Sequence, residues 1–349
     1  MSYLYLLIAA VLFSMQHFFL KQYEKKSDGT STAAVWTLLI RPVTLILFLT
    51  VLHGVFPIWE ELGGFFSRLS SPEGADASAV ATLIASVAFS VAVVISLPCA
   101  ILVMRHGKLL FSTASCQLGS FLVPFLYGVT LCGEPLSVPK TVGLVLIVLS
   151  LLLIGPNLPD FFLHPLQHMH PSREPGKEKE KKKGYSSFLF FILCFLLFVT
   201  SGTAGVGSAA SQKVENPLST DAFLILCMME IFVMAVLILL GIGIRRVTRG
   251  EKGALFKPFW AITKERFSFR TLLFLGAMAM LYGFSNGFAN IFSMLCAKTM
   301  DYSIQFPLLS ATMFILSAML GPLFFHEKLE KMDWIKVALA VAGLACFFF

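Results

Sequence analysis

Ten apolar segments, each about 18 to 28 residues long, make up most of this chain. A bilayer core about 30 Å thick needs roughly 20 apolar helical residues to cross it, and unpaired backbone amides are not tolerated in lipid. The sequence therefore predicts an all-α integral membrane protein with ten transmembrane helices. The segments cover approximately residues 3–20, 33–55, 79–104, 109–131, 138–155, 187–212, 220–244, 270–296, 303–325 and 333–349.

The polar remainder of the chain excludes several classes of protein. Its longest stretches, about 25 to 30 residues, are too short to build a soluble core, so any activity is expected inside the helix bundle or at its mouths. The net charge of +7 comes from loops that flank helices, as in membrane proteins generally, so no nucleic acid is expected. The sequence has no CxxC, HExxH or ATP-binding motif. We therefore expect no catalytic residues, no metal and no cofactor.

Basic residues divide unevenly between alternate loops and predict the orientation. One set of loops carries 22 of the 27 Lys and Arg residues, and the opposite set holds Arg68, Lys140, Lys213 and Lys298. Positive loops stay cytoplasmic. Both termini should therefore be extracytoplasmic in a multi-pass protein of the cell membrane. The net acidic stretch 57–77, interpreted as a loop, falls on the outer side, consistent with this orientation.

A charged segment divides the chain into two halves of five helices, residues 1–155 and 187–349. This segment, 156–186, contains the run KEKEKKKG and is too poor in apolar residues to fold alone. A solvated linker and a docking site are both open interpretations, as is a metal-binding histidine tract. A second inner loop, RGEKGALFKPFWAITKERFSFR, alternates apolar and basic residues and is typical of a short helix in the membrane interface. The histidines of the linker are His164, His168 and His170.

The two halves repeat each other. The motif GEPL at 133–136 and the motif HEKL at 326–329 each precede a terminal apolar segment, and an offset of 193 places Glu134 on Glu327. Because each half has five spans, the two repeats must run in opposite directions through the membrane. Inverted repeats are a transporter signature, since one sequence plan can then form inward-open and outward-open states. We expect Glu134 and Glu327 to cap helices or pair with loop cations.

On these motifs the whole chain resembles the drug/metabolite transporter superfamily, specifically its ten-helix EamA-like branch. The resemblance implies two inverted five-helix bundles around a central cavity and a metabolite, amino acid, nucleotide sugar or drug as substrate. Small four-helix relatives use a glutamate in their first helix for proton coupling. The first segment here has Gln16 and His17 instead. The cavity is implied to be lined mainly by segments 3–20, 79–104, 109–131, 187–212, 270–296 and 303–325.

Two full charges, Arg41 and Glu230, lie within predicted spans away from their ends. Each costs roughly 2.5–3.5 kcal/mol near a helix centre on insertion scales, so each needs a reason to be there. Contact with a substrate or proton is one interpretation. A structural role is the other, either as a salt bridge between the two or, for Arg41, by snorkelling from a peripheral helix. The sequence leaves open whether Arg41 and Glu230 pair.

Polar side chains also lie along single faces of the predicted helices. Tyr282, Asn286, Asn290 and Ser293 are spaced by four, four and three residues and share one helical face. Such a stripe cannot face lipid, so it must face a cavity or another helix. We predict a cavity shared with Gln117. The small-residue run TSGTAGVGSAAS in segment 187–212 predicts close helix packing. The substrate-binding candidates are Gln16, His17, Gln117, Tyr282, Asn286, Asn290 and Gln305.

Together these features predict a secondary transporter that moves a small polar or amphipathic metabolite or drug by alternating access. Its expected partners are a small-molecule substrate, the lipid bilayer and, as an open alternative, a coupling ion or counter-solute. A membrane-embedded scaffold without transport activity is the competing class. A scaffold would not need the inverted repeat or the amide stripe, and a sealed bundle without a polar cavity would favour it.

Overall fold

The protein is a bundle of long helices. The computed structural model describes residues 2–27, 31–53, 55–71, 76–106, 109–152, 187–248, 269–325 and 331–347. These ranges contain helices and no strand, as the sequence predicts. The helices are α1 (Ser2–Ser27), α2 (Ser31–His53), α3 (Val55–Leu69), α4 (Ala77–His106), α5 (Leu109–Leu131), α6 (Val138–Leu152), α8 (Ser187–Ala210), α9 (Thr220–Thr248), α11 (Phe269–Ala297), α12 (Tyr302–Phe325) and α13 (Lys331–Cys346).

Six of the described helices are long and apolar enough to cross a membrane, namely α1, α4, α8, α9, α11 and α12. The number rises to seven if α2 and α3 form one bent span, with 112° between their axes. Shorter apolar stretches lie in α5, α6 and α13. The described helices are thus those of a multi-pass membrane protein.

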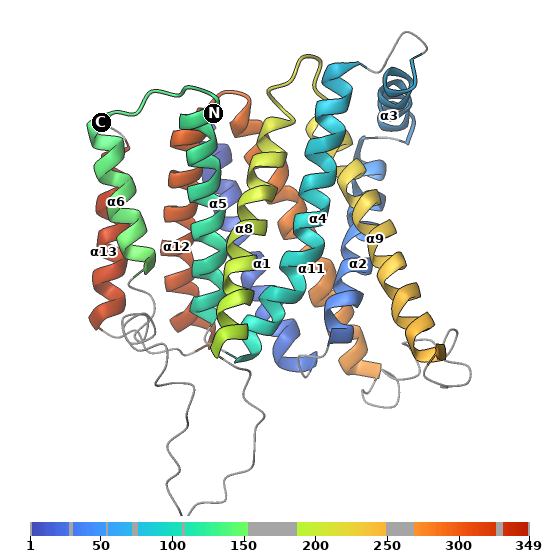
Figure 1. Cartoon of the computed structure of the whole chain (residues 1–349). Helices are drawn as coiled ribbons and strands as arrows, with labels where there is room; N and C mark the ends of the chain where they lie inside the picture. Colours follow the sequence, from blue (N-terminus) through green and yellow to red (C-terminus); the bar gives the residue numbers. More distant parts are fainter. Residues whose placement is uncertain are drawn as a thin grey trace, which may run out of the picture.

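The helices pack mostly across the two halves of the chain. Helix α1 packs against α11 and α12, and α8 packs against α4 and α5. Helix α2 contacts α9 and α11, while α9 also contacts α4. The remaining large contacts join α5 to α12 and α6 to α13. Figure 1 shows α6 and α13 side by side at one edge of the bundle, with α2 and α9 toward the opposite edge.

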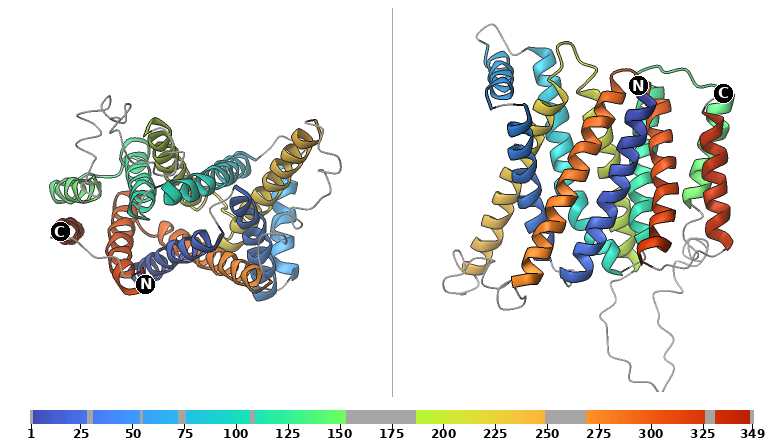
Figure 2. Two further views of the ribbon diagram at one scale, coloured as in Figure 1. Left: turned by 90° about the horizontal axis from the view of Figure 1, so that it is seen from below. Right: turned by 180° about the vertical axis from the view of Figure 1, so that it is seen from behind.

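The first helices of the two halves, α1 and α8, run in opposite directions (Figure 1). The N- and C-terminal ends lie at the same end of the bundle, which we call the terminal end (Figures 1 and 2). Helix α1 begins at the terminal end, whereas α8 finishes there (Figure 1). The start of α1 and the end of α13 thus lie at the same end of the bundle.

Glycines allow several of these helices to touch. A Cβ on Gly143 would lie 2.7 Å from the carbonyl oxygen of Gly343, and a Cβ on Gly343 would lie 2.9 Å from that of Gly143. Helices α6 and α13 therefore meet backbone to backbone. On α8, a Cβ at Gly207 would come within 2.9 Å of the Ala85 carbonyl oxygen on α4. The small-residue run of α8 thus does support close packing, as its spacing predicts.

The stretch 57–77, interpreted from sequence as a loop, contains a helix over most of its length. Helix α3 buries Ile58, Leu62 and Phe65, which recur every three or four residues and lie on one face. The Glu61 carboxylate accepts hydrogen bonds from the backbone N–H of Ser219 (2.6 Å) and from its hydroxyl (2.7 Å) at the start of α9. The loop interpretation was wrong because this amphipathic period is interrupted by glycines and charges.

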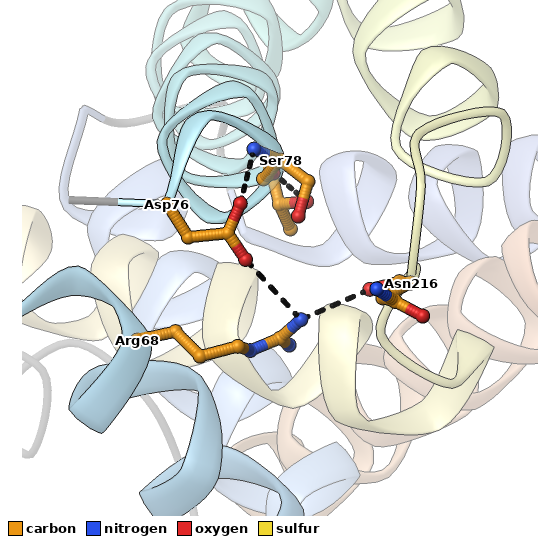
Figure 3. Close-up of polar contacts among 5 residues, drawn as sticks. Arg68, Asp76, Ser78 and Asn216 are labelled. Carbon is orange, nitrogen blue, oxygen red and sulfur yellow. Dashed lines mark hydrogen bonds and ion pairs between the residues drawn. The ribbon is translucent and has the colours of Figure 1, made fainter. Parts of the chain in front are cut away.

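A polar cluster ties α3 to its neighbours at the terminal end (Figure 3). Asp76 accepts a hydrogen bond from the backbone N–H of Ser78 (2.9 Å), which caps α4. This bond holds the pKa of the Asp76 carboxyl below its usual value. Arg68 lies 3.9 Å from the Asp76 carboxylate and donates to the carbonyl oxygen of Asn216 (3.4 Å) between α8 and α9.

Candidate functional site

A cavity of about 140 Å³, lined by both apolar and polar side chains, lies between the two halves of the bundle. Its lining comes from α1, α4, α5, α8, α11 and α12, the six helices that the family resemblance implies, together with Arg41 from α2. This volume is below the roughly 300–1,000 Å³ of pockets that take drug-sized ligands. The cavity therefore suits a small solute. Its polar lining residues are Gln16, His17, Arg41, Ser96, Cys116, Ser120, Ser201, Ser208, Tyr282, Asn286, Asn290 and Ser293.

The polar stripe of α11 faces inward. Tyr282, Asn286, Asn290 and Ser293 are all buried, and all four line the cavity. The structure therefore confirms that the stripe does not face lipid. It also shows that the two alternatives for the stripe are not exclusive, because the same side chains line the cavity and hydrogen-bond to neighbouring helices.

Asn286 is the centre of a hydrogen-bond network that joins three helices. Its side-chain oxygen accepts a hydrogen bond from Nη2 of Arg41 on α2, and its Nδ2 donates to Oε1 of Gln16 on α1. Asn290, one turn further along α11, donates from Nδ2 to the backbone oxygen of Asn286 (2.7 Å) and to its Oδ1 (3.1 Å). The network fixes the guanidinium of Arg41 against the wall of the cavity.

Two glycines of α11 let α2 bring Arg41 to this position. A Cβ on Gly283 would lie 3.2 Å from Cα of Arg41, and a Cβ on Gly287 would overlap the side chain of Leu45. A larger residue at Gly287 would displace the side chain of Leu45 on α2. The sequence interpretation did not single out these residues, although small residues four apart on an apolar helix are a signal for close contact.

Arg41 is only 1% exposed, yet it has no carboxylate partner among the described residues. Its guanidinium carbon lies 5.7 Å from the centroid of the Tyr282 ring. Its Nε is buried and makes no hydrogen bond within the described part of the chain. Arg41 is thus an interior cation held by neutral groups. It is not the peripheral, snorkelling arginine considered from sequence.

Glu230 lies apart from Arg41. Its Oε1 accepts a hydrogen bond from the hydroxyl of Ser86 on α4 (2.7 Å), and it is not among the residues that line the cavity. No ion pair joins Glu230 to Arg41, both of which the structure describes. The question that the sequence left open, whether these two charges pair, is therefore answered in the negative.

The other candidate residues fall into two groups. Gln16 and His17 line the cavity, and His17 Nε2 is buried without a hydrogen-bond partner among the described residues. Gln117 and Gln305 are buried but do not line it. Gln305 donates from Nε2 to the backbone oxygen of Ser293 (2.7 Å) and to its hydroxyl (3.1 Å). Gln305 thus holds Ser293 of the stripe in place from α12 without lining the cavity itself.

Glu134 caps a helix and pairs with a cation, as the sequence predicts. Its carboxylate accepts hydrogen bonds from the backbone N–H groups of Tyr302 (2.9 Å) and Ser303 (2.7 Å) at the start of α12. It also lies 3.6 Å from Nζ of Lys213, which sits 3.8 Å from the centroid of the Tyr302 ring. This cluster joins the α5–α6 and α8–α9 connections to α12.

Several sequence predictions lie outside the described residues. They concern Glu327 and the HEKL motif, the charged linker with its histidines, and the interfacial helix in the loop that precedes α11. Within the described ranges, no group of three or more His, Cys, Asp and Glu side chains is placed to hold a metal ion.

Comparison with known proteins bears on the fold alone. No protein-family model matches the sequence, and no curated protein matches it. The chain is similar to a solved structure described as "Crystal structure of protein", with a TM-score of 0.53 at 15% sequence identity. The similarity covers 97% of this chain and 95% of the other. An experimental structure with a related arrangement of helices over nearly the whole chain therefore exists.

Proposed function

We propose that this protein is a secondary transporter of the ten-helix EamA-like branch of the drug/metabolite transporter superfamily. It moves a small polar or amphipathic solute across the cell membrane by alternating access. The observation that carries this proposal is the interior cavity, which is lined by helices of both halves and includes a cluster of polar side chains and a buried charge. A scaffold has no need of such a cavity, because polar groups in a membrane interior are costly.

The packing of the helices supports an inverted repeat. If α1, α2, α4, α5 and α6 correspond to α8, α9, α11, α12 and α13, each large contact has a counterpart. The contact α1–α11 corresponds to α8–α4, α1–α12 to α8–α5, and α2–α11 to α9–α4. The contacts α2–α9, α5–α12 and α6–α13 correspond to themselves. This is the pattern of a two-fold axis in the membrane plane. Ten spans follow if α2, α5, α6 and α13 also cross the membrane.

Alternating access can be tested without knowledge of the substrate. Ser96 and Ser90 lie on α4, and Ser96 lines the cavity whereas Ser90 bonds to the carbonyl oxygen of Cys227 (3.1 Å). In a background from which the seven native cysteines have been replaced, Ser96→Cys should react with membrane-impermeant thiol reagents both in intact cells and in inverted vesicles. Ser90→Cys is the matched control and should react in neither.

The result separates the two classes of function. Reaction of the Ser96→Cys variant from both sides supports a transporter that exposes its cavity alternately. Reaction from one side only, or from neither, contradicts it and favours a binding pocket or a sealed scaffold. The same reagents test orientation. With both termini outside, a cysteine at position 2 should react in intact cells and one at position 180 should not, and the reverse pattern would overturn the orientation.

A further inference from the structure

The cavity has an unbalanced positive charge. Arg41 carries a full positive charge and lines the cavity. The described lining residues include no aspartate or glutamate. The carboxylate of Glu230 is engaged with Ser86, and that of Glu134 with the start of α12. Burying a charge without a counter-charge is unfavourable, and proteins normally pair it.

The partners of Arg41 hold the guanidinium without neutralising it. Asn286 offers an amide oxygen and Tyr282 an aromatic ring, and both are neutral groups. A guanidinium carries five N–H donors in a planar fork that matches the oxygens of a carboxylate or phosphate. The Nε of Arg41 makes no hydrogen bond within the described residues. The guanidinium therefore has a buried donor without a partner among the described residues, and the residue itself lines the cavity where an anion can pair with its charge.

We propose that the solute bound in this cavity is a small organic anion whose carboxylate or phosphate group pairs with Arg41. This inference rests on the proposed transport function and names its substrate class. Gln16 also lines the cavity, and its Oε1 accepts a hydrogen bond from Asn286. Its amide nitrogen can therefore donate to the same anion. The anion supplies the counter-charge that the described residues do not provide.

The remaining lining residues indicate that the part of the anion beyond its charged group is apolar. Phe13, Phe89 and Phe306 line the cavity together with aliphatic residues of α4 and α12. An apolar group would be buried against them, as in most small-molecule sites. With a volume of about 140 Å³, the cavity favours a compact aromatic or branched acid over a large dinucleotide or sugar nucleotide.

The charge requirement can be tested with pairs of probes that differ in charge and little in shape. The apparent melting temperature Tm of the purified protein in detergent is measured against benzoate and benzamide, and against phenyl phosphate and phenol, at constant ionic strength. A ligand that binds the folded state raises Tm with its concentration. At least one anion should raise Tm saturably, while its neutral partner does not. The carboxylate and phosphate arms distinguish the two anion chemistries.

Variants of the two buried or half-buried cations localise the effect. Arg41→Gln should abolish the response to the anion. Arg41→Lys, which keeps the charge and loses the fork, should weaken the apparent affinity at least about tenfold. Lys213→Gln is the matched control, since Lys213 has its own carboxylate in Glu134, and it should respond like the wild type.

Two results would overturn the inference. One is a wild-type protein that responds to benzamide or phenol as strongly as to the anions, or to none of the four. The other is an Arg41→Gln protein that keeps the wild-type response, and if that variant does not fold, an unweakened Arg41→Lys protein serves the same purpose. If the Ser96→Cys protein still reacts from both sides, only the charge class is wrong and transport stands.

Discussion

Two cations of this protein each lie over a tyrosine ring, but their surroundings differ. Lys213 is 3.8 Å from the centroid of Tyr302 and 3.6 Å from the Glu134 carboxylate, and its side chain is 36% exposed. Arg41 is 5.7 Å from the centroid of Tyr282 and 1% exposed, and no carboxylate of the described residues pairs with it. The cation nearer to solvent has a counter-ion within the chain, whereas the described part of the chain provides none for the buried one.

This difference indicates what each charge is for. The ion pair of Lys213 and Glu134 links connections at the terminal end, and Glu134 also supplies the first N–H groups of α12 with an acceptor. Its loss should therefore change stability. Arg41 is held in place by the amide network of α11, in a cavity that both halves line. Its loss should mainly change binding.

The largest effect on stability is expected from Glu134→Ala. The change leaves two backbone N–H groups at the start of α12 without their acceptor and removes the partner of Lys213. A cost of about 2–3 kcal/mol follows from the loss of buried hydrogen bonds to a charged group. Thermal unfolding in detergent would measure it. Glu134→Gln keeps one acceptor oxygen and should lose less, and an equal loss in both variants would contradict the capping role.

Asn286→Ala should instead weaken anion binding. Removing the amide releases Arg41 from its position and leaves Gln16 without its donor, so affinity should fall by about 1–2 kcal/mol with little change in folded yield. A titration of Tm against the active anion gives the affinity. Gln305 does not line the cavity but bonds to the lining residue Ser293. The Gln305→Ala variant is therefore the control and should retain affinity. Lost yield with unchanged affinity would mean that the stripe serves helix packing alone.

Arg41 and Glu230 should act independently. The single changes Arg41→Gln and Glu230→Gln and their double combination form a thermodynamic cycle on thermal stability. Because no ion pair joins the two residues and Glu230 bonds to Ser86, their effects should add to within about 0.5 kcal/mol. A larger coupling would show that the two charges interact after all.

The smallest effect concerns Asp76 at the terminal end, where the Ser78 N–H lowers the pKa of its carboxyl. A group whose pKa is lower in the folded state stabilises the fold above its unfolded pKa of about 3.8. That stabilisation is lost as the pH falls through the folded value. Asp76→Asn should remove this component from a plot of Tm against pH, and a curve with unchanged shape below pH 4 would contradict the capping by Asp76.

The sequence predicts the all-helical, multi-pass character well and the contacts between helices less well. Apolar length and the four-residue spacing of Tyr282, Asn286 and Asn290 are properties of single helices, so they can be inferred locally. The position of Arg41 depends on how closely α2 approaches α11. That approach is set by Gly283 and Gly287 on a different helix. Helix α3 was missed although Ile58, Leu62 and Phe65 recur at helical spacing, because the glycines and charges around them favour a loop.

Gln117 also shows that contacts between helices are harder to predict than the helices themselves. Its place on a polar face of segment 109–131 made it a candidate for the cavity, yet the structure buries it completely beside the lining residue Cys116 without placing it in the lining. Neighbouring positions on a helix point about 100° apart. A helical face therefore predicts burial more reliably than contact with one particular cavity.

Arg41, and not Lys213, should receive an anion from outside the chain. Diffraction from crystals grown with 4-bromobenzoate, at a concentration that saturates its effect on Tm, tests this claim directly through the anomalous signal of bromine. We expect a bromine peak in the cavity among the apolar lining residues, with the carboxylate directed at Arg41, and no peak there in Arg41→Gln crystals. A peak against Lys213, or no peak in the wild-type cavity, would contradict it.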